Sequence, residues 1–379
     1  MLRPLTAIAG IFVILAIVWD AFEALVLPRT ASRAFRPARL FYRTSWPTWV
    51  AVARLLGRGR SRETFLAIYG PLSFLALLAC WASALVVAFG MVIWGFGSHF
   101  IAPEGGRSFW TDLYLSGTTL FTLGIGDVTP SDSVGRFVTV IEAGVGFGFL
   151  ALVIGYLPVL YQGFSKREVN ISLLDARAGS PPSAGELLRR HGHDAAELDL
   201  LFRDWERWAS ELMESHLSYP MLMFFRSQHE HQSWLGALTA VLDASALVMV
   251  GVEGVPKRQA QLTFAMARHA AVDLAQATGM SPKPCDPDRL PPEDMAALRA
   301  SLASAGVALA EGPVAESTLR SLRGMYEPYV AGLADRLCLV LPPWRAPDGE
   351  ADDWLTSAWE ADPEKRRLQG PGGHDEPHI

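Results

Sequence analysis

The run Thr122-Leu123-Gly124-Ile125-Gly126-Asp127 has residue types and a spacing that suit the coordination of a dehydrated cation. Glycines at alternate positions tolerate backbone conformations that residues with a Cβ avoid, so successive carbonyl oxygens can point toward one axis. Four such strands around the axis would replace the water shell of a cation. Gly-x-Gly also occurs in ordinary tight turns, so the surrounding elements must decide between the two interpretations.

Two long apolar segments flank this run. Residues 64–103 carry no Asp, Glu, Lys or Arg, and residues 137–165 carry only Glu142. Each segment exceeds the roughly 20 residues that a helix needs to cross a bilayer. A third apolar run, 5–27, lacks an Ala-x-Ala cleavage site and favours an uncleaved span over a signal peptide. We therefore expect an all-α membrane protein with three transmembrane helices and a re-entrant pore loop between the second and third.

The linker at 28–62 contains nine arginines and no acidic residue. The positive-inside rule places such a segment in the cytoplasm. It follows that the N-terminus lies outside, that residues 122–127 face outward and that everything after Lys166 is cytoplasmic. We expect a multi-pass protein of the cell (plasma or inner) membrane.

Part of this linker repeats arginine every three or four residues, which invites a voltage-sensor interpretation. A sensor needs several helices with countercharges, whereas one span precedes the linker and Pro37 and Pro47 interrupt it. We expect instead that Arg29 to Arg62 binds anionic lipid, with aromatic residues at the acyl boundary. These aromatic residues are Phe35, Phe41, Trp46 and Trp49.

Two acidic residues, Asp20 and Glu23, lie on one face near the inner end of the first span. Pairing with Arg29 or Arg33 would lower the cost of placing their charges within the bilayer. We expect such a pairing.

The residues around the Thr-x-Gly-x-Gly-Asp run complete a recognisable pattern. Residues 108–121 have the length of a short pore helix, and Gly135-Arg136 opens a glycine-containing helix after the run. The stretch from Ser116 to Pro158 resembles the pore domain of prokaryotic two-helix potassium channels, and the likeness covers about residues 72–163. The resemblance implies a selectivity filter at Thr122, Leu123, Gly124, Ile125, Gly126 and Asp127.

By this resemblance, K⁺ binds at Thr122, Leu123, Gly124 and Ile125, with the Thr122 hydroxyl as the innermost oxygen ring. Leu123 and Ile125 turn outward, and Asp127 lies at the external mouth. K⁺ is expected as the permeant ion, without any other cofactor. Since the sequence holds one such run, the pore should be a homotetramer.

Several residues are expected to support or gate the filter. Trp110 and Tyr114 would form an aromatic cuff, while a hydroxyl of Thr118 or Thr119 would satisfy Glu142. Gly146 falls at the hinge position of the resembling channels, although close helix packing explains its glycine equally well. Gly155 and Pro158 are further gate candidates. Pro158 would either bend the inner helix or end it.

Ile125 replaces the aromatic residue usual at this filter position and removes a hydroxyl that braces the filter from behind. Potassium selectivity is expected, but a poorly selective cation pore is the first alternative.

The remaining chain predicts helices separated by Pro and Gly. Asp194 and Glu197 form a capping box, and further helices are expected at 258–278, 292–309 and 314–339. The apolar segment 234–252 is predicted as a buried helix, because Lys257 and Arg258 after it would otherwise lie outside. The expected organisation is a first span at 1–28, a linker at 29–63, a pore domain at 64–163, a helical cytoplasmic domain at 164–362 and a disordered tail at 363–379.

The pattern disfavours other functions. The sequence shows no catalytic constellation, metal-ligand spacing or nucleotide-binding glycine loop, so we expect neither an enzyme nor a nucleic-acid partner. It leaves the ligand of the cytoplasmic domain unknown. The alternative from another class is a membrane-anchored sensor or scaffold with a vestigial pore.

Overall fold

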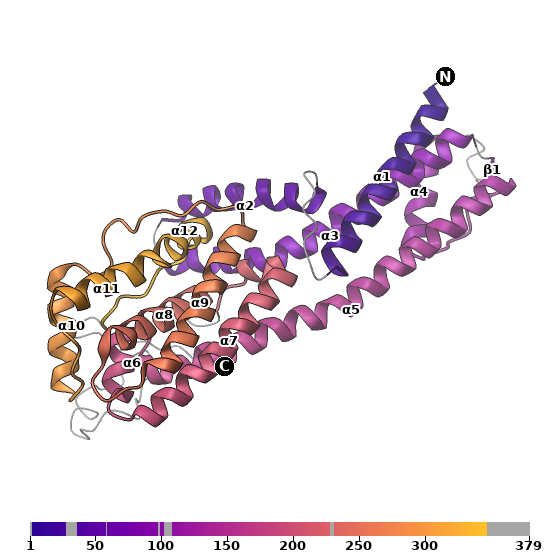
Figure 1. Ribbon diagram of the computed structural model, residues 1–379. Helices are drawn as coiled ribbons and strands as arrows, with labels where there is room; N and C mark the ends of the chain where they lie inside the picture. The colour runs from indigo at the N-terminus through magenta and orange to yellow at the C-terminus, as the bar shows by residue number, and fades with distance from the viewer. Residues whose placement is uncertain are drawn as a thin grey trace, which may run out of the picture. The chain divides into compact units, whose positions relative to one another are not determined.

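The computed structural model describes residues 2–27, 36–57, 59–97, 99–101, 108–227 and 231–346. These residues are mostly helical and form two compact units (Figure 1). Unit 1 holds residues up to 165 together with 214–226, and unit 2 holds 166–213 and the residues from 227 onward. The expected all-α membrane fold is confirmed. The expected tail at 363–379 lies outside the described residues.

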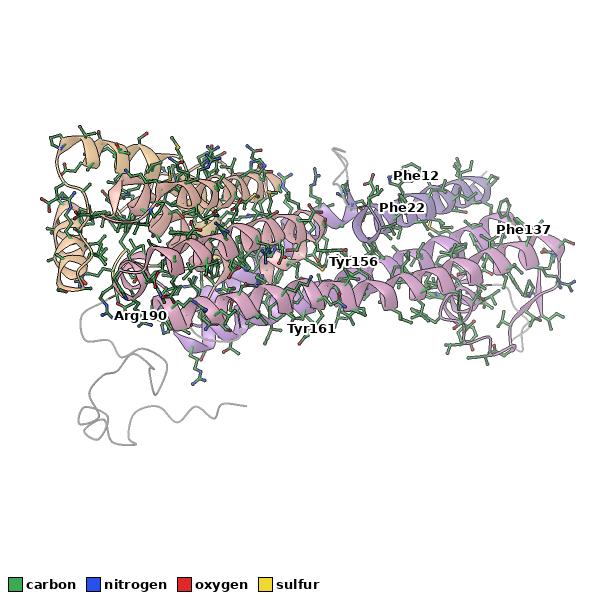
Figure 2. All side chains as sticks on the ribbon, turned by 60° about the horizontal axis from the view of Figure 1, so that its bottom comes forward. Phe12, Phe22, Phe137, Tyr156, Tyr161 and Arg190 are labelled. Carbon is green, nitrogen blue, oxygen red and sulfur yellow. The ribbon has the colours of Figure 1, made fainter. Side chains whose placement is uncertain are left out.

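Unit 1 contains three long apolar helices, α1 (Leu2–Leu25), α3 (Arg60–Phe96) and the first part of α5 (Ser133–Ala178). Glycines bring α1 and α3 close, because a Cβ on Gly10 would lie 2.6 Å from the Ala88 carbonyl oxygen. Such close backbone approach is typical of helices packed in a membrane. On its other side, α1 exposes large apolar side chains such as Phe12 and Phe22, a surface that suits lipid (Figure 2).

Helix α5 continues through Pro158 to Ala178. The interpretation that Pro158 ends the inner helix is therefore wrong, and the apolar segment 137–165 is only part of a longer helix. A proline removes one backbone hydrogen bond, and the turns on both sides of it are sufficient to continue this helix.

The linker helix α2 (Pro37–Leu55) turns its tryptophans inward. Trp46 packs between Tyr69 of α3 and Phe224 of the 3₁₀ helix η1 (Pro220–Phe224), and Trp49 stacks on Phe65 at 4.3 Å between ring centroids. Trp46 is buried against aromatic neighbours of α3 and η1, so the expectation that it meets the acyl boundary is wrong. Trp49 and Phe41 are half-buried, and their position at the acyl boundary stays a prediction. Arg39, Leu40, Arg43, Val52 and Arg54 lie on the exposed face, whereas Phe35 lies outside the described residues.

Asp20 and Glu23 meet Arg36 at the start of α2. Asp20 Oδ2 accepts hydrogen bonds from the Ala38 N–H at 2.9 Å and the Trp81 indole at 3.1 Å. Arg36 Nε lies 3.3 Å from Glu23 Oε2 and 3.9 Å from Asp20 Oδ1. The predicted partners Arg29 and Arg33 lie outside the described residues, and Arg36 serves that role in the described chain.

Unit 2 is a helical bundle. After the end of α5 it contains α6 (Ala184–His191), most of α7 (Ala195–Ser218), α8 (Trp234–Gly251), α9 (Lys257–Ala277), α10 (Pro292–Ser304), α11 (Pro313–Gly324) and α12 (Glu327–Leu337). Asp194 caps α7, accepting from the amides of Ala196 and Glu197 at 3.0 Å. The predicted capping box is confirmed in this half alone, because the Asp194 amide donates to the His191 carbonyl at 3.0 Å and not to Glu197.

Helix α8 is long and apolar enough to cross a membrane, as are α1, α3 and α5. Its neighbours within unit 2 bury it, however, and 83% of its apolar window is inside the structure. This burial agrees with the predicted core helix.

Two predicted helices differ from the structure. The predicted segment 314–339 is divided into α11 and α12, with Tyr326 outside helical geometry and Pro328 in the first turn of α12. Pro328 has no amide hydrogen to continue a helix from α11. The predicted segment 292–309 ends at Ser304, and Val252 then pairs with Leu309 in an isolated bridge. Residues 214–226, expected in the cytoplasmic domain, cluster with unit 1.

Candidate ion-conducting site

The short helix α4 (Phe109–Leu120) precedes the Thr-x-Gly-x-Gly-Asp run, close to the predicted 108–121. The hydroxyl of Ser108 caps its first turn by accepting from the Trp110 amide at 3.3 Å. The C-terminal end of α4 leads directly into residues 122–127, so its partial negative charge is directed at them.

Pore-helix carbonyls hold the amides of the run. The Thr118 carbonyl accepts from Leu123 at 2.8 Å and from Gly124 at 3.2 Å, and the Thr119 carbonyl accepts from Thr122 at 2.9 Å. Three consecutive N–H groups are therefore engaged on the side of α4.

The backbone of the run alternates in handedness. φ is +57° at Thr122, +56° at Gly124 and +81° at Gly126, whereas Leu123 and Ile125 are not in the positive-φ region. Alternation of this kind turns successive carbonyls toward one side, as a cation-coordinating strand requires. The positive φ of Thr122 is unusual for a β-branched residue, and such strained conformations concentrate at functional sites.

Tyr114 braces the outer end of the run. Its hydroxyl donates to Asp127 Oδ2 at 2.9 Å, and Asp127 Oδ1 accepts from the Val128 amide at 2.9 Å. Trp110, the other expected member of the aromatic cuff, is 74% exposed in the single chain and packs against Phe109. The structure thus brings Tyr114, but not Trp110, to the run.

Asp132, which the sequence analysis missed, secures the chain after the run. Its carboxylate accepts from the Gly135 amide at 2.6 Å and from the His99 amide at 2.9 Å. These bonds hold the pKa of Asp132 below its ordinary value, the Gly135 bond most strongly. The neighbouring strands β1 (Phe100–Ile101) and β2 (Thr129–Pro130) pair antiparallel, with Phe100 opposite Pro130. Aspartate just before a helix is a capping signal that the sequence does contain.

Glu142 is fully buried against α4, as expected, but with a different partner. It is hydrogen-bonded to the hydroxyl of Ser116 rather than to Thr118 or Thr119. The Thr118 hydroxyl instead donates to the Leu115 carbonyl of its own helix at 3.0 Å. Residues two and three positions after Ser116 point to other sides of α4, because successive helical residues are rotated by about 100°.

Gly146 lies one turn further along α5. A Cβ at this position would lie 2.1 Å from the Leu120 carbonyl oxygen, so close packing requires glycine here. Gly155 has open space where a Cβ would stand. The packing explanation therefore accounts for Gly146, while hinge or gate roles for Gly146, Gly155 and Pro158 stay predictions.

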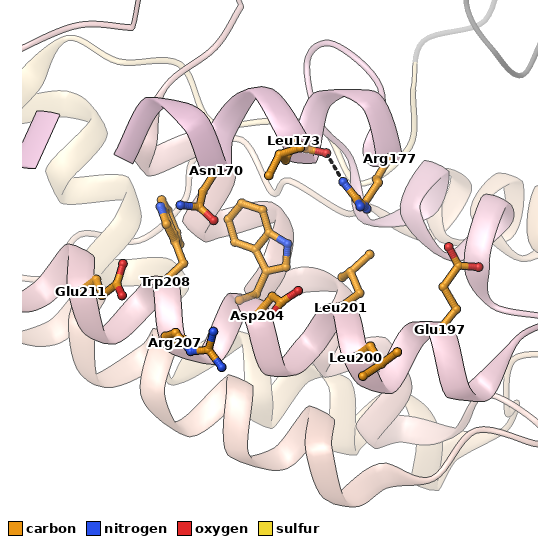
Figure 3. A pocket seen from close by; sticks show the side chains of 11 residues that line it. Asn170, Leu173, Arg177, Glu197, Leu200, Leu201, Asp204, Arg207, Trp208 and Glu211 are labelled. Atoms are coloured by element: carbon orange, nitrogen blue, oxygen red, sulfur yellow. Dashed lines mark hydrogen bonds between the residues drawn. The ribbon is translucent and has the colours of Figure 1, made fainter. Parts of the chain in front are cut away.

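Unit 2 contains a cavity of about 440 Å³ between the end of α5 and α7 (Figure 3). Trp208 rises from α7 toward Asn170 on α5, and Arg177 donates to the Leu173 carbonyl at 3.0 Å. The cavity lining mixes Arg177 and Arg207 with three acidic residues, Glu197, Asp204 and Glu211, so its charge does not select one class of ligand.

Comparisons with known proteins agree with the geometry of unit 1. Residues 67–162 match a family model described as "Ion channel", a range that includes the filter-like run and most of its flanking helices. The chain is 26% identical over 193 residues to the uncharacterized membrane protein YdjJ of Bacillus subtilis (strain 168). That alignment covers 49% of this chain and 55% of YdjJ, so the chain spans about half the length of this relative. No solved structure matches. These findings support an ion-channel domain in a membrane protein.

Proposed function

We propose that this chain is one subunit of a homotetrameric cation channel that prefers K⁺. The alternating backbone of residues 122–127 carries the proposal, because it directs carbonyls to one side while α4 holds three of the amides. In the tetramer, K⁺ binds the carbonyls of Thr122, Leu123, Gly124 and Ile125 and the Thr122 hydroxyl. Conduction is passive and driven by the ion gradient.

Exposed apolar side chains around the run support the tetramer. In the single chain, Trp110, Phe121, Leu123 and Ile125 are 74%, 59%, 65% and 61% exposed. Apolar patches of this kind mark surfaces that another molecule covers. Three further copies around the filter axis would both cover them and enclose the ion, which one strand cannot do.

The preference for K⁺ over Na⁺ rests on how rigidly the filter is held. Ile125 lacks a hydroxyl, but the Tyr114–Asp127 hydrogen bond braces the outer end. The rival within transport is a poorly selective pore. Reversal potentials in opposing K⁺ and Na⁺ gradients distinguish the two, since a selective pore follows the K⁺ gradient.

A segment after α7 supports gating by the helical domain. Tyr219 packs on Tyr156 of α5 at 5.4 Å between ring centroids, and the Tyr156 hydroxyl lies 3.7 Å from Met221 Sδ. A Cβ on Gly163 would lie 3.2 Å from Leu222. Residues 219–222 therefore pack against the inner helix beside Pro158, a predicted gate residue.

The same segment also holds the outer helix. Arg226 pairs with Glu63 at 2.7 Å, and Phe224 stacks on Tyr42 at 5.7 Å between ring centroids. Residues 219–226 thus join α2, α3 and α5, and they are covalently continuous with α7. We infer that a rearrangement of the helical domain reaches the inner helix through this segment, and that Leu222→Ala changes the open fraction of the channel.

The decisive experiment is ion flux through the purified full chain in liposomes, with K⁺, Na⁺ and Ba²⁺ compared. K⁺ flux that Ba²⁺ blocks and Gly124→Asp abolishes is expected. The matched control is Gly324→Asp, because Gly324 in unit 2 has open space for a side chain. Absence of flux in the wild type under all conditions would overturn the channel and favour the scaffold alternative. Flux that Gly124→Asp leaves intact would place any ion path elsewhere.

A further inference from the structure

The hydroxyl of Ser116 has two oxygen neighbours on different helices. The carbonyl oxygen of Val86 on α3 is 2.8 Å away, and Glu142 Oε1 on α5 is also within hydrogen-bond distance. A serine hydroxyl carries one proton, and a backbone carbonyl can only accept. If each contact is a separate two-centre hydrogen bond, the second proton must come from Glu142.

An ionised Glu142 would be poorly accommodated. Ser116 could then donate to only one of its two oxygen neighbours. The Ser116 oxygen and the other neighbour would face each other without a proton between them. Glu142 Oε2 is buried without a hydrogen-bond partner, and no Lys, Arg or His forms an ion pair with Glu142 in the part of the chain that the structure describes. The acid that shares this face of α4 is Asp112, one turn before Ser116, and it is also buried. Burying an unpaired charge is far more costly than burying a neutral acid.

We propose that Glu142 is a neutral carboxylic acid that donates its proton to Ser116 Oγ, while Ser116 donates to the Val86 carbonyl. This chain of two hydrogen bonds ties the inner helix α5 through the pore helix α4 to the outer helix α3. The protonation state is independent of conduction, whereas the role that follows rests on the proposed channel function.

The position of this chain makes Glu142 a positioning residue for the filter. Ser116 meets Glu142, and Leu120, four residues later, meets Gly146, four residues after Glu142. These two contacts are one helical turn apart on each helix, and together they fix the position of α5 along α4. The last turn of α4 also supplies the Thr118 and Thr119 carbonyls that hold the filter amides. Glu142 therefore acts on the filter through α4, without adding a charge behind the ion path.

Infrared spectroscopy of the purified full chain tests the proton directly. At about pH 7, where an ordinary glutamate is ionised, the difference between wild type and Glu142→Gln should contain the carbonyl band of a protonated acid. Ser116→Ala should shift that band. The matched control Thr118→Ala should not shift it, because the Thr118 hydroxyl bonds within its own helix. A carboxylate band in place of the acid band would overturn the proposal.

Ion flux tests the positioning role. Glu142→Gln keeps a neutral donor and should retain K⁺ flux within about twofold, whereas Glu142→Leu, which cannot hydrogen-bond, should lower it about tenfold. A Gln variant as defective as the Leu variant, with wild-type thermal stability, would refute the role. If the protein showed the acid band but no ion flux, the proposal that Glu142 is neutral would stand and the proposed channel function would be wrong.

Discussion

Units 1 and 2 each bury an acidic residue completely, and they neutralise it in different ways. Asp243 on α8 accepts from Arg289 at 2.6 Å and from the Tyr326 hydroxyl at 2.5 Å. Glu142 on α5 has a serine hydroxyl as its partner and no cation among the described residues. In unit 2 the charge of Arg289 balances the buried carboxylate of Asp243. In unit 1 a bound proton makes Glu142 neutral, so no second ion is needed within the membrane.

The Asp243 site of unit 2 extends beyond one pair. Arg289 also lies 3.2 Å from Glu327 and over the ring of Trp344, and Arg323 pairs with Glu327 at 3.0 Å. Burial raises the pKa of Tyr326 and that of Glu327. The network connects α8, α11, α12 and the loop before α10, so we expect it to stabilise unit 2.

Removing the cation from the Asp243 site should produce the largest effect. Arg289→Met leaves the Asp243 carboxylate buried without its main countercharge, and we expect a loss of about 3–5 kcal/mol in the free energy of unfolding. Thermal unfolding of the full chain in detergent measures it. Arg320→Met, at an exposed position of α11, is the control. Equal stability of the two variants would contradict the importance of the ion pair.

Neutral amide replacements compare the two acids directly. Asp243→Asn removes a charge that Arg289 needs and should cost about 1–3 kcal/mol, whereas Glu142→Gln replaces one neutral group by another and should cost less than about 1 kcal/mol. The same unfolding measurement serves both variants. If Glu142→Gln were the more damaging, the distinction between countercharge and proton would fail.

Asp127 extends the comparison to an exposed carboxylate. Tyr114→Phe removes the hydroxyl that donates to Asp127 and should raise the permeability of Na⁺ relative to K⁺ by a factor of about three. Reversal potentials measure the ratio. Tyr161→Phe, at an exposed tyrosine of α5, provides the control, and an unchanged ratio in Tyr114→Phe would show that this bond does not govern selectivity.

His191 extends the comparison to a base in unit 2. Burial lowers its pKa, although Glu197 Oε1 at 3.1 Å from Nδ1 acts in the opposite direction. Since the unfolded chain then binds a proton more readily, unit 2 should lose stability as the pH falls below about 6.5. Denaturant midpoints at several pH values should show a smaller loss for His191→Asn. Parallel curves for the two proteins would contradict the assignment to His191.

Local patterns predicted much of the fold and of the filter. The Asp194 cap, the pore helix and the burial of 234–252 depend on residues near one another in sequence, and the structure contains all three. The alternating φ values agree with the glycine spacing that first indicated a coordinating strand. The predictions were wrong where the partner of a side chain lies far away in the sequence. Glu142 contacts Ser116 rather than Thr118 or Thr119, and Trp46 packs against Phe224 rather than facing lipid.

Hydrophobic length and glycine spacing are local properties of the chain, so they were sufficient to predict the helical membrane class and the position of the filter-like run. Which side chains meet became known from the folded structure. It brought residues 219–226 to the inner helix and the Tyr114 hydroxyl to Asp127, and it placed Ser116 between Val86 and Glu142. Partners separated by tens of residues are selected by helix rotation and close packing, which composition and periodicity do not specify.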